Sequence, residues 1–322
     1  MKKIRVTVLA GGPSAEHDVS MMSAKNVVSA LDRAKYDVRV VKIPRRSGWF
    51  PTRTFVRSTD VVFPVLHGTY GEDGTVQGLL TAIGVPFVGA GVLGSAVGMD
   101  KDVMKRLLRD AKLPIARYIA ARRDQAPSFA HAKRVLGLPL FVKPANLGSS
   151  VGVSKVKSAL EYDAALKHAF SFDEKIMIEE FIKGREVEVA VLGNERPEAS
   201  VAGEIAPTHE FYSYEAKYLD EGGAVLSIPA KLSPSLMKKA RDLALRAYSA
   251  LECSGLGRVD MFVTSSGAMY VNEINTLPGF TNISMYPKLW EYSGLSQPKL
   301  VDRLIELALA RAQRTAALRR ER

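Results

Sequence analysis

Cysteine is almost absent from this chain of 322 residues, because Cys253 is the only one. An internal disulfide is therefore impossible, and a zinc site built on cysteines is not expected. Long apolar runs are lacking too, since none approaches the roughly 18–20 residues that a membrane span requires. The N-terminus starts with two lysines, as a signal peptide does, but the apolar run after them is short and ends at Gly11. These absences predict a cytoplasmic protein without membrane insertion.

Acidic residues are fewer than basic ones, 34 against 45, which gives a formal net charge of +11. An excess of this size raises the question of nucleic acid binding. Part of it is local, since residues 311–322 contain five arginines and one glutamate, a surplus of +4. Elsewhere the basic residues are scattered, without the interleaved aromatic residues of a stacking platform. An enzyme that holds a nucleoside triphosphate also needs positive charge, so we expect no nucleic acid partner.

The chain has ordinary globular composition, and its length predicts two or three domains. Apolar runs rich in β-formers alternate with helical patterns in its first part. We predict strands at 4–10, 37–43, 60–66 and 85–89, and helices at 18–31 and 75–83. This alternation is typical of a parallel sheet with ligands at the carboxyl ends of the strands.

A second unit begins near Gly91, with expected helices at 99–111 and 128–136 and strands at 140–143, 152–156 and 175–181. From Gly184 onward, strict alternation in Glu186–Val191 predicts a half-buried strand of an antiparallel sheet. Two late strands, Gly257–Thr264 and Ala268–Asn275, flank a short turn like a hairpin. The sequence therefore predicts three α/β units, at residues 1–90, 91–183 and 184–322.

The segment Lys143–Gly152, KPANLGSSVG, is a strand end that opens into a loop of glycines and hydroxyls. Small residues let backbone N–H groups approach an anion closely, and the adjacent lysine neutralises it. This composition indicates a phosphate loop, although a flexible surface hairpin has the same composition. It is not of the Walker type, because no Gly-x-x-x-x-Gly-Lys-Ser/Thr occurs in the chain.

Three hard oxygen ligands lie on the expected late hairpin. Glu273 and Asn275 are two residues apart, so both side chains leave the same face, and Asp260 on the partner strand can meet them. Two carboxylates and an amide oxygen suit Mg²⁺ shared with phosphates. Arg258, two residues before Asp260, shares its face. A polar sheet face with satisfied ion pairs would have the same pattern.

Two further segments give weaker signals. The strand edge Ile178–Ile182 followed by Glu186 could offer backbone groups to an adenine and a carboxylate to a ribose, but an ordinary strand looks the same. Gly89–Gly94 matches the dinucleotide fingerprint locally. That fingerprint calls for an acid after the next strand, whereas the next apolar run ends in Arg122 and Arg123, which could suit a 2′-phosphate. A nicotinamide-dependent oxidoreductase therefore stays open as an alternative.

The five histidines show no metal-ligand spacing. His67 differs from the others because it follows an expected strand end, within the segment HGTYGEDG. That placement suits a loop that faces a substrate.

Together these motifs resemble the D-alanine–D-alanine ligases of the ATP-grasp superfamily, over nearly the whole chain. Seven segments match the family in order. They are Gly11–Ser20, His67–Gly74, Met99–Lys101, Lys143–Gly152, Tyr214–Tyr218, Gly257–Asp260 and Asn272–Thr281. The resemblance implies an N-terminal parallel-sheet domain and two α+β domains that enclose ATP. It also implies a homodimer. The arginine-rich tail after about Ala310 matches no family segment.

The resemblance further implies which residues hold ATP and metal. ATP would be bound by Lys101, Lys143, Ser149, Ser150, Glu179, Glu180, Glu186 and Lys217, with the backbone near Phe181 and Ile182 against the adenine. Two Mg²⁺ ions, with Mn²⁺ as an alternative, would be bound by Asp260, Glu273 and Asn275.

For the two D-alanine molecules the family implies a second set of residues. Glu16 would receive the ammonium of the first, oriented by a network through Ser149 and Tyr218. Either Ser149 or Ser150 could join this network, and the motif register favours Ser149. His67 would lie near the first substrate, and Ser284 with the backbone near Gly279 would hold the carboxylate of the second. Arg258 and the Gly279 N–H would stabilise the oxyanion, under a lid formed by the loop with Lys217 and Tyr218.

The expected reaction is the ATP-dependent joining of two D-alanines through a D-alanyl phosphate, for peptidoglycan precursor synthesis. An alternative in the same superfamily is a ligase that makes a D-alanyl-D-lactate ester or uses another amino acid.

Overall fold

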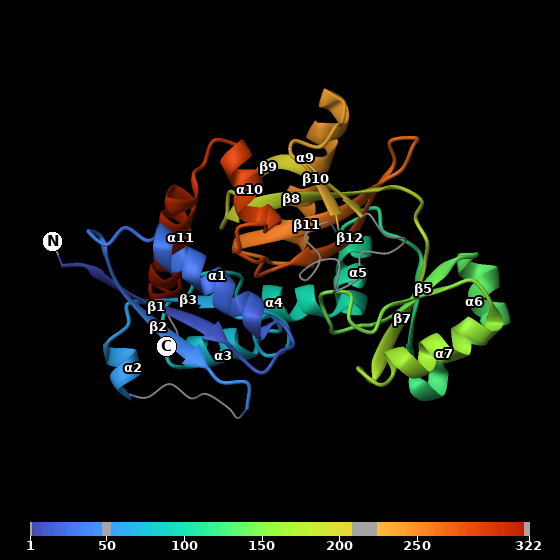
Figure 1. The fold of residues 1–322 in the computed structure, drawn as a ribbon, viewed down its shortest axis with the longest axis horizontal. Coiled ribbons are helices and arrows are strands. Elements are labelled where there is room, and N and C mark those ends of the chain that lie inside the picture. The colour runs from blue at the N-terminus through green and yellow to red at the C-terminus, as the bar shows by residue number, and fades with distance from the viewer. Residues whose placement is uncertain (1, 47–52, 208–223, 319–322) are drawn as a thin grey trace.

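The computed structural model describes residues 2–46, 53–207 and 224–318. Within these ranges the chain forms three β-sheets with helices packed on them (Figure 1). The N-terminal sheet and the central sheet lie at opposite ends of the view, and the strands of the third sheet lie between and above them.

The first sheet is parallel, with strand order β2-β1-β3. Its elements are β1 (Ile4–Gly11), α1 (His17–Ala30), β2 (Tyr36–Ile43), α2 (Arg53–Arg57), β3 (Val61–Val65) and α3 (Thr75–Ala82). The last six residues of β1 are buried, because Val6, Val8 and Ala10 face one core and Leu9 faces another. A parallel strand covered on both sides is an almost continuous apolar run, as this one is.

The central sheet is antiparallel, in the order β4-β7-β5-β6. Its elements are β4 (Tyr118–Arg122), a 3-10 turn (Arg123–Gln125), α6 (Phe129–Leu136), β5 (Leu140–Pro144), β6 (Ser154–Val156), α7 (Ala159–Ala169) and β7 (Lys175–Glu180). Leu140 and Val142 face a core with α6 and α7. Because side chains alternate along a strand, Phe141 and Lys143 lie on the opposite face.

The third sheet has the order β10-β9-β8-β11-β12 and is antiparallel throughout. Its elements are β8 (Arg185–Gly193), β9 (Glu198–Pro207), β10 (Ala224–Ser227), α9 (Pro234–Ala250), β11 (Gly255–Val263), β12 (Met269–Asn275), α10 (Met285–Tyr292) and α11 (Gln297–Ala316). Helix α9 covers the face to which Val187, Val189 and Val191 point. Helices α10 and α11 cover the opposite face at Ala190 and Leu192.

This arrangement corrects the expectation for Glu186–Val191. The strand is antiparallel as predicted, but it is not half-buried, since every residue of β8 from Val187 to Gly193 is buried. Its alternating acids, Glu186 and Glu188, lie on the other face of the sheet, the one that Ala190 and Leu192 share with α10 and α11. The period of two therefore reflects two different covers, with valines packed under α9 on one face and Glu188 paired with Arg258 on the other, and not bulk solvent.

Two helices connect the first unit to the others, α4 (Val92–Met99) and α5 (Lys101–Asp110). The sequence led us to expect one helix over 99–111 and a strand at 85–89. The expected helix is present as α5, but α4 before it was not predicted, and Asp100 separates the two by capping α5, where it accepts from the N–H groups of Asp102 and Val103. The expected strand at 85–89 is absent, since Phe87 forms only an isolated bridge to Val62. Met104 and Leu108 of α5 pack in the core under α9, on the third sheet.

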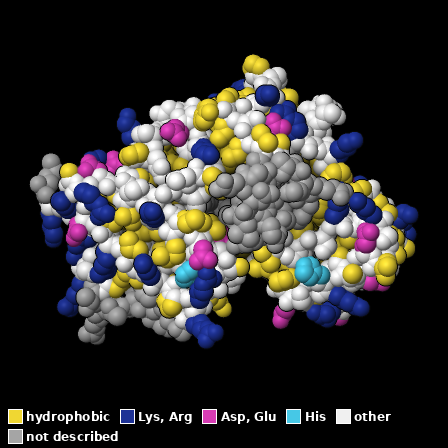
Figure 2. All heavy atoms as spheres, viewed as in Figure 1, with side chains coloured by type: hydrophobic (Ala, Val, Ile, Leu, Met, Phe, Trp, Pro, Cys, Tyr) yellow, Lys and Arg dark blue, Asp and Glu magenta, His cyan; other side chains and the backbone are white. Residues whose placement is uncertain are grey.

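Helix α11 is the last helix of the described chain, yet it packs on the first sheet, beside α1 (Figure 1). Its residues share one core with β1 and β3. None of the helices in the described ranges has the combined length and hydrophobicity that a membrane crossing needs. Figure 2 shows Lys and Arg side chains spread over the visible face among acidic and apolar ones, without a single basic patch.

Candidate functional site

Three contacts bring the predicted site segments together. The Ser149 hydroxyl lies 2.5 Å from Glu16 Oε1, which joins the central sheet's loop to the start of α1. Lys101 Nζ donates to the Leu147 carbonyl at 2.6 Å, and the same ammonium lies 3.5 Å from Glu273. The loop, the N-terminal unit and the third sheet therefore meet at one place.

The loop after β5 has a strained backbone, and hydrogen bonds with neighbouring segments fix its first residues. Ser149 and Ser150 both have positive φ, 51° and 60°, a conformation that is costly for residues other than glycine and that is concentrated at functional sites. Asp173 accepts hydrogen bonds from the backbone and side-chain nitrogens of Asn146, at 2.8 and 3.0 Å. The Lys101 N–H donates to Ala145 at 3.0 Å. This segment connects the antiparallel strands β5 and β6, and hydrogen bonds with Asp173 and Lys101 brace its first residues.

Lys143, at the root of this loop, lies in a buried chain of charges. Its Nζ is 2.5 Å from Glu179 Oε2, and Lys105 Nζ is 2.5 Å from the other oxygen of the same carboxylate. Burial alone would raise the pKa of Glu179, but the two ammonium groups outweigh it and lower that pKa. Burial alone would lower the pKa of Lys143, but Glu179 and Glu273 raise it. Both groups therefore stay charged.

The end of β7 separates the two glutamates predicted to hold the nucleotide. Glu179 faces Lys105 and Lys143, whereas Glu180 lies on the opposite face of the strand and pairs with Arg117. Arg117 donates to it from Nε at 2.6 Å and from its backbone N–H at 2.7 Å. Phe181 is 39% exposed, and its ring lies 6.1 Å from that of Phe141. An exposed aromatic ring at a strand end suits a flat heterocycle.

Beside this strand end, Ile182 follows Phe181 in the connection to β8, and Glu186 lies on β8 opposite Ile205. The Lys155 ammonium lies 5.1 Å from the centre of the Phe181 ring. The predicted ATP roles of Glu179, Glu180, Phe181, Ile182 and Glu186 remain predictions.

The predicted metal ligands face one another in the register of β11 and β12. Asp260 is paired with Glu273, and Arg258 with Asn275. Arg258 donates to both oxygens of Asp260 at 2.7 Å, and its Nε also lies 2.9 Å from Glu188. The pairing that was inferred from spacing is therefore present, and Glu188 is an additional acid at this place.

The donor set is suitable for magnesium. Within the described parts of the chain, no three side chains of His, Cys, Asp and Glu form a group that could hold a metal ion by themselves. Asp260, Glu273 and Asn275 provide two carboxylates and an amide, the oxygen ligands that Mg²⁺ shares with phosphates in nucleotide sites. Arg258 and Lys101 balance the two carboxylates, so the pair is not left as uncompensated negative charge.

The N-terminal side of the site is built around Glu16, which is buried. A Cβ at Gly68 would come within 2.7 Å of its carboxylate and 2.6 Å of the Ser14 hydroxyl, so only glycine fits at this position, where φ is 71°. His67 is buried, and its Nδ1 lies 3.1 Å from the Leu277 carbonyl. Burial alone would lower the pKa of His67, but Glu72 and then Glu16 raise it.

The segment after β12 is braced by the same N-terminal residues. The Phe280 N–H donates to the Ser23 hydroxyl at 3.1 Å. The Ser284 hydroxyl accepts from the Thr281 N–H at 2.9 Å and precedes the first turn of α10. A Cβ at Gly279 would lie 2.9 Å from this hydroxyl, so Gly279 and Ser284 are adjacent. Free N–H groups at a helix start favour a carboxylate.

Two predicted residues, Lys217 and Tyr218, and the lid that would contain them lie outside the described residues. Sequence reasoning missed several polar residues of the site: Lys105, Glu188, Asp173, Ser23 and Glu72. One signal was available for Lys105, since its spacing of four from Lys101 places both on one face of a helix.

The glycine fingerprint at Gly89–Gly94 has a packing role. Gly91 precedes α4, and a Cβ at Gly94 would lie 2.8 Å from the Glu252 carbonyl oxygen. The glycine thus permits close contact between α4 and the turn before β11. The next strand, β4, ends at Arg122 and not at the acidic residue that the dinucleotide fingerprint requires.

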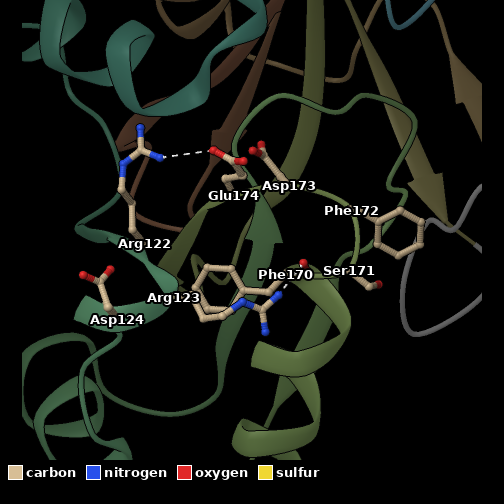
Figure 3. A pocket seen from close by; sticks show the side chains of 8 residues that line it. All are labelled: Arg122, Arg123, Asp124, Phe170, Ser171, Phe172, Asp173 and Glu174. Atoms are coloured by element: carbon tan, nitrogen blue, oxygen red, sulfur yellow. Dashed lines mark hydrogen bonds and ion pairs between the residues drawn. The ribbon is translucent and has the colours of Figure 1, made fainter.

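A separate surface pocket of about 480 Å³ lies at the outer end of the central sheet. Figure 3 shows Arg122 directed at Glu174, at 3.6 Å, and Arg123 beside the ring of Phe170. Its two arginines are thus already engaged by protein groups. Asp173, on its wall, belongs to the loop brace described above.

Comparison with known proteins gives a consistent result. The family models described as D-ala D-ala ligase N-terminus and C-terminus match residues 5–59 with 51–90, and residues 107–306. The D-alanine--D-alanine ligase of Oceanobacillus iheyensis is 49% identical, over 100% of this chain and 99% of its own. The D-alanine--D-alanine ligase A of Escherichia coli K12 is 48% identical, over 99% of each.

Two solved structures are similar over nearly the whole chain. The D-alanine-D-alanine ligase from Coxiella burnetii has a TM-score of 0.88 at 39% identity, over 98% of this chain and 97% of its own. VanG D-Ala:D-Ser ligase from Enterococcus faecalis has a TM-score of 0.86 at 34% identity, over 95% and 100%. The predicted fold class, a parallel-sheet N-terminal domain followed by two α+β domains, is confirmed.

Proposed function

Since the chain belongs to the D-alanine–D-alanine ligase family, we propose that it joins two D-alanine molecules to D-alanyl-D-alanine at the expense of ATP, for peptidoglycan precursor synthesis. The observation that carries the proposal is the contact of the phosphate loop with Glu16. It brings a nucleotide-type loop and a buried carboxylate suited to an ammonium group within hydrogen-bonding distance, through Ser149.

The first half of the reaction explains the positive charges around the loop. A carboxylate is a poor electrophile because its leaving group would be oxide, whereas an acyl phosphate has a good one. Transfer of the γ-phosphoryl group to the first D-alanine needs its developing charge to be balanced and its groups aligned. Lys143 and Lys101 supply that charge from either side of the loop. Mg²⁺ bound by Asp260, Glu273 and Asn275 would supply further neutralisation of the phosphates.

The second half needs an electropositive place for an oxyanion. The free amine of the second D-alanine attacks the acyl phosphate and gives a tetrahedral oxyanion. Arg258 is suited to stabilise it, because Glu188 and Asp260 fix its guanidinium in one orientation. The N–H of Gly279 is the second donor to the oxyanion. Ser284 and the start of α10 bind the carboxylate of the second D-alanine. Glu16 binds the ammonium group of the first D-alanine, and the His67 ring contacts the backbone carbonyl of Leu277.

One assay tests this function. Purified protein is incubated with ATP, Mg²⁺ and D-alanine, and ADP, phosphate and dipeptide are measured together. A ligase releases ADP and phosphate in a one-to-one ratio with dipeptide, and L-alanine gives none. ATP hydrolysis without dipeptide would contradict the proposal, and a nicotinamide-dependent oxidoreductase would give neither product.

The choice of second substrate is tested in the same reaction. D-lactate as second substrate would give an ester. D-serine would give D-alanyl-D-serine, the product that the name of the VanG D-Ala:D-Ser ligase indicates. In the family, a tyrosine at the position of Tyr218 accompanies dipeptide formation, and phenylalanine accompanies the use of lactate. We therefore propose that D-alanine is preferred and that ester is not formed at neutral pH.

The remaining proposals concern the setting of the reaction. We place it in the cytoplasm, where ATP is available and where a chain with one cysteine has no need of disulfides. We also propose a homodimer with two Mg²⁺ ions per site. Light scattering should give about twice the 35.1 kDa of the chain, and a mass of one chain would contradict the dimer.

A further inference from the structure

Lys105 has no part in the proposed reaction, and its environment is unusual for a lysine. It lies in the second turn of α5 with 0% exposure. Lysine is almost never fully buried unless it is paired, because the ammonium loses its hydration. Burial lowers the pKa of Lys105, and Glu179 opposes that effect.

Glu179 is shared between two lysines. One oxygen lies 2.5 Å from Lys105 Nζ and the other 2.5 Å from Lys143 Nζ. The side chains of the three groups are 0%, 6% and 10% exposed for Lys105, Glu179 and Lys143. One carboxylate thus faces two ammonium groups, of which only Lys143 lies at the root of the phosphate loop.

The two lysines on α5 have different tasks. Lys101, one turn earlier on the same face, reaches the loop backbone at Leu147 and the carboxylate of Glu273. Lys105 has no exposed surface and contacts the Glu179 oxygen that Lys143 does not contact. A direct contact between Lys105 and a nucleotide phosphate would require it to leave this buried position.

Binding of a phosphate by Lys143 creates a problem for Glu179. Lys143 must direct its charge to the ligand, which weakens its pairing with the carboxylate. A buried carboxylate without a partner is strongly unfavourable, so Glu179 alone would hold Lys143 back. A second ammonium that never leaves removes this conflict.

We propose that Lys105 is a positioning residue that neutralises Glu179, so that Lys143 is free to bind the phosphates of the nucleotide. The inference rests on the proposed function, because it assumes that the loop binds a nucleotide. Lys105 acts through Glu179 and touches neither substrate nor nucleotide.

The first test is Lys105→Met, which keeps the length of the side chain and removes the charge. Binding of ADP with Mg²⁺, measured by calorimetry, should weaken about tenfold or more, since Lys143 is then retained by Glu179. The KM for D-alanine should change less than twofold. Arg109→Met is the matched control, because it removes a positive charge from the exposed face of the same helix and should leave ADP binding unchanged.

A double-mutant cycle separates this role from a direct one. In the Glu179→Gln background the carboxylate that holds Lys143 is gone, so adding Lys105→Met should weaken ADP binding less than twofold. An equal loss in both backgrounds, or no loss in either, would overturn the proposal.

Stability is measured on the same variants. If Lys105→Met does not fold, the double variant decides, because it replaces a buried ion pair by two neutral groups of similar size. A folded double variant that binds ADP as Glu179→Gln does supports the inference, and an unfolded one refutes it. Failure of the wild type to bind ADP would refute the proposed function first, and this inference with it.

Discussion

Asp260 and Glu273 face each other in adjacent strands, and Arg258 and Lys101 balance their charges. Replacing Asp260 by Asn removes a charge and little volume, so the fold should persist. We expect Asp260→Asn to lower the rate of dipeptide formation by about 10²- to 10³-fold, because charge stabilisation at the metal is lost. Rates at saturating ATP and melting curves measure the two effects, and wild-type activity at ordinary Mg²⁺ would remove the metal assignment.

Glu16 is a buried carboxylate that accepts a short hydrogen bond from Ser149. If it receives the ammonium of the first D-alanine, Glu16→Gln should raise the KM for D-alanine about 10- to 100-fold, the range of a lost charged hydrogen bond, and that for ATP much less. Asp18→Asn is the control, since Asp18 is an exposed acid two residues away that pairs with Arg45. Equal KM values for D-alanine in Glu16→Gln and wild type would place the ammonium elsewhere.

At the scale of elements, the phosphate loop depends on the segment before β7. Asp173 accepts from both nitrogens of Asn146 and from the Lys175 N–H. Asp173→Ala should therefore raise the KM for ATP about 3- to 10-fold, with little change for D-alanine, because the two bonds to Asn146 are exposed and together stabilise the loop by about 1 kcal/mol. Asp124→Ala is the control, as Asp124 lines the same pocket without contacting the loop (Figure 3). Similar KM values for ATP in the two variants would show that the brace is not needed.

Sequence patterns located most elements because alternation and helical periodicity are local. They predicted that Asp260 would meet Glu273, since strand geometry alone fixes that relation. They did not reveal α4, because its glycines resemble a phosphate-binding turn until the contact of Gly94 with Glu252 is known. Nor did they indicate that β8 is covered on both faces, since its second cover comes from α10 and α11, about a hundred residues later.

The buried lysine shows a different limit. A lysine in an amphipathic helix is normally exposed, so the spacing of Lys105 from Lys101 indicates a shared helix face but does not indicate burial. Its burial follows from the packing of α5 between the third sheet and β7, a relation between elements far apart in the chain. Side chains that serve the site through another residue therefore emerge only from the assembled structure.

For the whole molecule, the first and third sheets form one body. Their residues share a single core, in which α11 packs against β1 and β3. Arg311 joins the two at the end of α11. It donates to the carbonyls of Phe87 and Gly89 at 2.8 and 2.5 Å and to the Ser254 hydroxyl at 2.5 Å, and burial lowers its pKa to about 10. The first arginine of the basic tail is thus a structural residue and not a free charge.

This arrangement makes a prediction about stability that is independent of catalysis. Arg311→Met leaves two backbone carbonyls without their donor, so it should lower the free energy of unfolding by about 2–4 kcal/mol. Arg314→Met is the matched control, one turn later on α11, where the ion pair with Glu195 is exposed and should be worth less than about 1 kcal/mol. Thermal unfolding of both variants measures the difference. Equal melting temperatures would show that the core of α11 holds the two sheets together without Arg311.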